Sequence, residues 1–219
     1  MALRASIKRF LRALVLAVAL CGATSVFAEV KQSSADGFLI SFSAPVAATP
    51  STTYADVVQI QRWWNGEHTF SGKSSNLSLK AEAGGCFCEK WSGGSVEHGR
   101  VIMALPGKVL RLDAALGPLQ EFALKGILSF WIKTEDSATT LTVEYRVNGA
   151  SASALDTFAP SVDDVLGMQV DRLRRFIATG NPEPPPDPSA GDKSAKPAPG
   201  AKPAKPKPRS AKPDVPAKQ

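Results

Sequence analysis

The sequence predicts an α+β domain in which a curved antiparallel sheet of about seven strands lies against one long C-terminal helix. Three observations lead to this fold class. Short segments with alternating apolar and polar residues follow one another, separated by joints that contain Gly or Pro. An amphipathic stretch with helical periodicity follows the last of these segments and ends near Ala178. Residues 29–180 also have ordinary globular composition and the length of a single core-forming domain.

Seven segments carry the strand pattern. They span residues 37–46, 77–82, 86–92, 96–105, 109–116, 124–132 and 140–147. The last two are the clearest, because Leu128 and Phe130 share one face of the first. Leu141, Val143 and Tyr145 alternate with polar residues in the second. The short joints predict an antiparallel meander with one face in contact with solvent.

Two segments carry the helical pattern. Residues 52–65 follow Ser51, which is a suitable N-cap. The second helix begins at about residue 155 or at Ser161, where a capping-box-like pattern occurs, and Gly180 ends it. Its apolar stripe has to cover a large apolar surface, and the inner face of the sheet is the surface that the sequence offers.

The N-terminal 28 residues have the three-part pattern of a secretory signal peptide. Four basic residues precede an apolar run at 13–20, and Val26 and Ala28 form a suitable cleavage site. The pattern predicts export to the periplasm, which is an oxidising compartment. An uncleaved anchor is one alternative, and a lipid on Cys21 is another, although the bulky Leu20 before this cysteine disfavours lipid attachment.

Residues 181–219 predict a disordered tail rich in Pro, Lys and Ala. This segment holds 12 of the 17 prolines and eight basic residues, and it has no aromatic residue. Two interpretations follow from this composition. The tail either contacts an anionic membrane or cell-wall polymer, or it is a passive solubilising extension.

The charges of the predicted domain exclude one class of partner. Residues 29–180 carry 14 basic and 16 acidic side chains, so the overall charge of +6 comes from the two ends of the chain. This balance gives no argument for nucleic-acid binding. His68 and His98 lack the spacing of metal ligands, and each is expected on a surface loop. No cofactor motif is found, and no feature indicates an oligomeric state.

Cys86 and Cys88 are the two cysteines of the predicted domain. On a regular strand their Cα atoms would lie about 6.6 Å apart with parallel side chains. This geometry is unfavourable for a disulfide, so a bridge between them would be easily reduced. Free thiols, a local disulfide and a redox role therefore remain open.

Four runs of residues resemble one protein superfamily. They are WWNGEHTFSG (63–72), NLSLKAEAGGCFCEKW (76–91), TLTVEYRVNG (140–149) and VDDVLGMQVDRLRRF (162–176). They resemble the SRPBCC, or START-like, superfamily, in particular the branch of heat-shock-protein-90 ATPase activator homologues and polyketide cyclase/dehydrase-like proteins. The resemblance implies a helix-grip fold with a deep apolar cavity. It also implies binding of lipids, sterols, polyketides or aromatic compounds, with enzymes in the minority.

The sequence and the resemblance together predict binding of a hydrophobic small molecule between the sheet and the C-terminal helix. The expected lining residues are Trp63, Phe70, Leu128, Phe130, Leu141, Val143, Tyr145, Leu166 and Gln169. A cyclase- or dehydratase-like enzyme is an alternative, with Glu89 and Tyr145 as candidate acid–base groups. A second alternative is an envelope interaction protein that acts through its basic tail.

Overall fold

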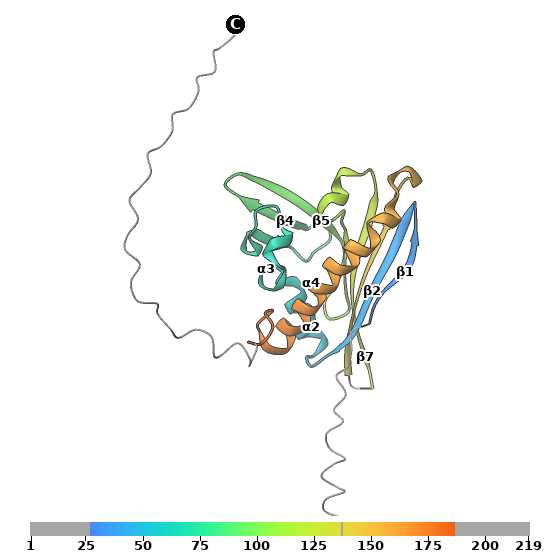
Figure 1. Ribbon diagram of the computed structural model, residues 1–219. Helices are drawn as coiled ribbons and strands as arrows, with labels where there is room; N and C mark the ends of the chain where they lie inside the picture. The colour runs from blue at the N-terminus through green and yellow to red at the C-terminus, as the bar shows by residue number, and fades with distance from the viewer. Residues whose placement is uncertain (1–26, 137, 187–219) are drawn as a thin grey trace, which may run out of the picture. The chain divides into compact units, whose positions relative to one another are not determined.

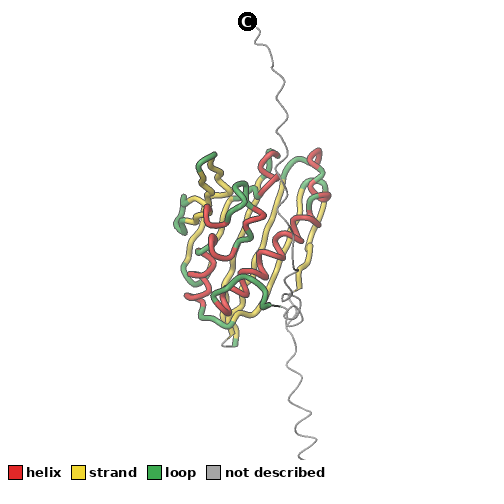
Figure 2. Tube along the Cα trace, turned by 60° about the vertical axis from the view of Figure 1, so that its left-hand side comes forward, coloured by secondary structure: helices red, strands yellow, loops and turns green. Residues whose placement is uncertain are grey.

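The computed structural model describes residues 27–136 and 138–186 and shows one eight-stranded antiparallel sheet (Figure 1). The strands are β1 (Phe27–Ser34), β2 (Gly37–Val46), β3 (Leu77–Leu79), β4 (Cys86–Trp91), β5 (Gly94–Leu105), β6 (Val109–Asp113), β7 (Lys125–Glu135) and β8 (Ala138–Asn148). The helices are α2 (Pro50–Val58), α3 (Ile60–Trp63) and α4 (Ala159–Thr179). They lie on one face of the sheet, as Figure 2 shows.

This arrangement confirms the predicted α+β helix-grip architecture. The strand order is β1-β2-β8-β7-β6-β5-β4-β3, so β3 to β8 form the predicted meander and β8 pairs with β2. The additional strand is β1, whose sequence FAEVKQSS shows no apolar alternation. It is an edge strand, because β2 is its single neighbour in the sheet. The rest of the predicted signal peptide, and the predicted tail from residue 187, lie outside the described residues.

The region predicted as one helix over residues 52–65 forms two helices, α2 and α3. Helix α2 begins two residues earlier than predicted, at Pro50. Thr49, and not Ser51, is the N-cap, since its Oγ1 accepts a hydrogen bond from the Thr52 N–H at 3.2 Å. Pro50 takes the first helical position, where a missing N–H costs nothing. Gln59 has non-helical backbone angles (φ −80°, ψ 48°) and separates α2 from α3.

The long helix α4 extends across the sheet (Figure 1). It starts at Ala159, so Ser161 lies inside its first turn and does not cap it. The end at Gly180 agrees with the prediction, because this glycine has the left-handed φ of 75°. Arg172 fixes α4 to α3, since its Nε donates to the carbonyl oxygen of Trp63 at 2.8 Å.

The space between the middle of α4 and the sheet is filled. Trp63, Phe130 and Val143 meet residues of α4 there, around a void of about 10 Å³. A void of this size holds at most one water molecule. Within the described residues, no helix combines the length and the apolar character that crossing a membrane requires.

Candidate functional site

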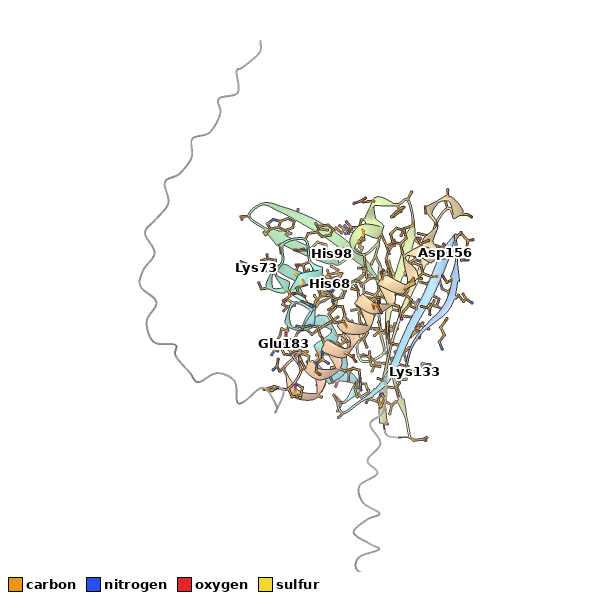
Figure 3. All side chains as sticks on the ribbon, in the orientation of Figure 1. His68, Lys73, His98, Lys133, Asp156 and Glu183 are labelled. Atoms are coloured by element: carbon orange, nitrogen blue, oxygen red, sulfur yellow. A yellow bond between two sulfur atoms is a disulfide. The ribbon has the colours of Figure 1, made fainter. Side chains whose placement is uncertain are left out.

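A cavity of about 520 Å³ lies beside the N-terminal half of α4. Its other walls are the 3-10 turns η1 (Gly66–His68) and η3 (Gly117–Glu121), with one residue from β5. Its apolar lining residues are Trp64, Phe70, Leu116, Pro118, Leu119, Phe158, Val162, Val165 and Leu166. Its polar ones are Glu67, His68, Thr69, His98, Gln120, Glu121 and Ser161. Figure 3 labels His68 and His98, which lie to one side of α4.

Tyr145 positions one wall of this cavity from the core. Its buried hydroxyl donates to the carbonyl oxygen of Ala114 at 3.0 Å and accepts from the Leu116 N–H at 3.1 Å. Burial raises the pKa of the Tyr145 hydroxyl well above its ordinary value, so the hydroxyl stays protonated. Leu116 directly precedes η3, and this bond therefore fixes the start of the η3 wall.

The structure places the predicted lining residues in two regions. Phe70 and Leu166 line the cavity. Trp63, Leu128, Phe130, Val143 and Gln169 surround the small void beneath α4, and Leu141 and Tyr145 are buried in the core. The predicted position of the cavity is thus corrected, because large side chains fill the space under the middle of the helix. A role of these residues in ligand binding stays a prediction.

Gln169 is buried and connects α4 to a neighbouring segment. Its Oε1 accepts a hydrogen bond from the Asn65 N–H at 2.8 Å. This bond joins α4 to the segment that leads from α3 into η1. Gln169 therefore positions the η1 wall, and its predicted contact with a ligand stays a prediction.

The prediction that His98 lies on a surface loop is wrong. His98 belongs to β5 and is only 6% exposed. The pairing of β4 with β5 shifts at this point: Cys88 lies opposite Glu97, while Phe87 lies opposite Gly99. His98 is therefore the extra residue of a β-bulge, and bulges redirect side chains relative to simple alternation. His68, in contrast, lies in η1 and is half-buried.

Glu89 is fully buried on β4 and accepts three hydrogen bonds. Its Oε1 accepts from the Ser71 N–H at 2.6 Å, and its Oε2 accepts from the Phe70 N–H at 3.1 Å. The third bond joins Oε2 to Nε2 of His98 at 3.0 Å. Burial by itself would raise the pKa of Glu89, but these hydrogen bonds outweigh it and hold the pKa below its ordinary value. Glu89 is therefore an ionised carboxylate that anchors the segment carrying Phe70.

The imidazole ring of His98 lies between two aromatic rings. The Phe87 ring centroid is 4.8 Å away and the Phe70 centroid 5.9 Å away, with interplanar angles of 31° and 33°. Burial lowers the pKa of His98, and the hydrogen bond and charge of Glu89 offset this only in part. His98 is consequently neutral at pH 7, although it lies beside a carboxylate.

Cys86 and Cys88 form a disulfide in the structure. Their Cα atoms lie 5.4 Å apart, which is closer than a regular strand allows. The disulfide lies where the pairing of β4 with β5 shifts register, between Phe87 and Cys88. The local disulfide is thus the alternative that the structure contains, and a redox role stays a prediction.

Metal-binding side chains do not converge in the described part of the chain, where no group of three or more His, Cys, Asp or Glu residues is placed to hold an ion. The site is therefore described by its apolar walls and by the Glu89–His98 pair. These features define the class of the protein: a helix-grip domain with an open, mainly apolar cavity at one end of its long helix.

Comparison with known proteins places the fold. No family model matches the chain, and no curated protein matches it. A conserved protein of unknown function from Enterococcus faecalis, EF2215, has a TM-score of 0.50 at 12% identity, over 72% of this chain and 80% of that one. The Aha1 dimer from Colwellia psychrerythraea has a TM-score of 0.48 at 16% identity, over 65% and 97%. CalU16 from Micromonospora echinospora has a TM-score of 0.46 at 17% identity, over 74% and 88%. At this level of identity the likeness to the Enterococcus faecalis protein shows a shared fold alone.

Proposed function

We propose that the protein binds a hydrophobic small molecule, a lipid or an aromatic compound, in the cavity beside α4. The observation that carries the proposal is the cavity itself. Its volume of about 520 Å³ lies in the range of small-molecule sites, and apolar side chains form most of its walls. A few polar groups, with His98 among them, supply orientation.

Burial of apolar ligand surface provides the driving force. A ligand that loses about 200 Å² of apolar surface gains about 5 kcal/mol at 25 cal/mol per Å², before the costs of association. Trp64 and Phe158 contribute aromatic surface to the walls and favour planar or ring-containing ligands.

A fluorescent probe tests the proposal directly. N-phenyl-1-naphthylamine is neutral and apolar, and we expect its fluorescence to increase on binding to the full chain. Val165→Trp places a large side chain in the cavity and should weaken this binding at least tenfold. Ala178→Trp adds the same group at an exposed position of the same helix and is the matched control. Equal binding by both variants would contradict the proposed site.

We also propose export to the periplasm and contact of the tail with anionic surfaces. The support is the leader pattern in residues 1–28 and the basic, proline-rich composition of residues 181–219. Cell fractionation, with the N-terminal sequence of the recovered protein, tests export. Binding to anionic vesicles at low salt, compared between the full chain and a chain ending at residue 180, tests the tail.

The Glu89–His98 pair favours a second candidate function, catalysis of the cyclase or dehydratase kind with His98 as the base. In the simplest such step, a proton passes from the α-carbon of a ketone to His98, and the electron pair moves into the carbonyl as an enolate. Deuterium uptake by 2-tetralone in heavy water measures this step. If His98 is the base, the protein should accelerate deuterium uptake above the rate in buffer, and His98→Phe should abolish the acceleration. Uptake at the buffer rate with the unmodified protein would exclude catalysis for this ketone.

A further inference from the structure

The hydrogen bonds around Glu89 determine which nitrogen of His98 carries the proton. Glu89 accepts from two backbone N–H groups, and hydrogen bonding holds it as a carboxylate, so it has no proton to donate. The short contact between Oε2 and Nε2 therefore requires Nε2–H as the donor. In a neutral imidazole the other nitrogen, Nδ1, then carries the free lone pair.

Nδ1 of His98 is an unused acceptor at the cavity. No residue of the described chain makes a hydrogen bond to it, and it is not among the fully buried polar atoms that lack a partner. The ring itself lines the cavity. The flanking rings of Phe70 and Phe87 and the bond to Glu89 hold it in one orientation.

We propose that His98 Nδ1 accepts a hydrogen bond from the ligand, and that the cavity therefore selects apolar molecules bearing a hydroxyl group, such as phenols or apolar alcohols, over the corresponding ethers. The inference rests on the proposed binding function and specifies its ligand class. A hydroxyl donates to the lone pair, whereas an ether oxygen brings a second lone pair toward it. An acceptor left unpaired when the ligand displaces water disfavours the ether.

Polarisation by Glu89 strengthens this preference. The carboxylate attracts the Nε2 proton and so increases the electron density at Nδ1, which makes Nδ1 a better acceptor than an isolated imidazole nitrogen. The Glu89 side chain is fully buried and does not line the cavity, so it acts on the ligand through its hydrogen bond to His98. It is thus a positioning residue, and His98 is the residue that contacts the ligand.

The test compares 2-naphthol with 2-methoxynaphthalene on the full chain by isothermal titration calorimetry. We expect 2-naphthol to bind about tenfold to a hundredfold more tightly, the range that one unpaired buried acceptor gives. In His98→Phe the ring stack remains but both nitrogens are lost, so the two affinities should become similar. Glu97 is next to His98 but does not line the cavity, so Glu97→Gln is the matched control that should keep the preference.

The outcomes separate this inference from the binding function. Equal affinity of the two molecules for the unmodified protein would overturn the inference alone, and so would a preference that persists in His98→Phe or disappears in Glu97→Gln. Failure of both molecules to bind would overturn the inference together with the binding function. If His98→Phe does not fold, ¹⁵N NMR of the histidine rings in the unmodified protein decides. The Nδ1 resonance of His98 must move on addition of 2-naphthol and stay in place with the ether, and an unmoved resonance refutes the inference.

Discussion

Replacement of Glu89 by glutamine should destabilise the protein far more than its single-atom change suggests. The two carboxylate oxygens accept from Ser71, Phe70 and His98. A glutamine side chain has one oxygen and one NH₂ group, so at least one of the backbone N–H groups must face another donor. An unsatisfied buried donor costs about 1–3 kcal/mol. The remaining bonds also lose their charge, which weakens them by about 1 kcal/mol. We therefore expect a loss of about 2–4 kcal/mol in the free energy of unfolding.

Urea unfolding of Glu89→Gln and of a matched control measures this loss. The control is Glu97→Gln, which makes the same change beside His98 but at an exposed ion pair with Arg100. Such surface pairs contribute about 0–1 kcal/mol. The dependence of the unfolding free energy on urea should be the same in both variants if only stability changes. A loss in Glu89→Gln no larger than in the control would refute the anchoring role of Glu89. Hydrogen exchange offers a second readout, since the Phe70 and Ser71 amides should exchange faster in Glu89→Gln alone.

Three further predictions concern the core and the effect of pH. Tyr145→Phe removes the hydroxyl shared by Ala114 and Leu116 and should lower the unfolding free energy by about 1–3 kcal/mol in the same urea measurement. Gly126→Ala would push a methyl group into the carbonyl oxygen of Ala114 and should lower the unfolding free energy by about 3 kcal/mol in the same measurement. Near-native stability would show that the backbone at Ala114 can move away from residue 126. The pKa of His98 lies below its ordinary 6.5, so on acidification the unfolded chain gains a proton before the folded one does. Stability should therefore fall as the pH is lowered through 6.5 toward the folded pKa, and this part of the pH dependence should be absent in His98→Phe.

The sequence predicts this fold well because its strands bury one face. Alternation along residues 124–132 and 140–147 identifies the inward side chains, and Tyr145 and Val143 are indeed buried. Alternation does not show how completely those side chains fill the interior. Trp63 and Phe130 pack with residues of α4 around a void of only about 10 Å³. The strand β1 was not predicted because its pairing depends on backbone hydrogen bonds rather than on an apolar pattern.

The candidate site was harder to predict than the fold for a related reason. Two of its walls are turns, whose side-chain directions follow no period, and His98 lies in a β-bulge. Strict alternation along residues 96–105 puts neighbouring residues such as Glu97 and His98 on opposite faces of a strand. It gave no sign that the pairing shifts there, or that Glu89 lies within reach of His98. A signal was present in the spacing of Glu89, Gly93, Gly94 and His98, which allows a tight hairpin to bring the acid and the imidazole together.

The interior beneath the middle of α4 is filled, whereas the cavity lies partly between the turns η1 and η3. Substitutions in η1 and η3 alter the chemistry presented to a ligand without opening a hole among the packed side chains under α4. Under the proposed binding function, substitutions in these two short turns would change which ligand fits without repacking the interior.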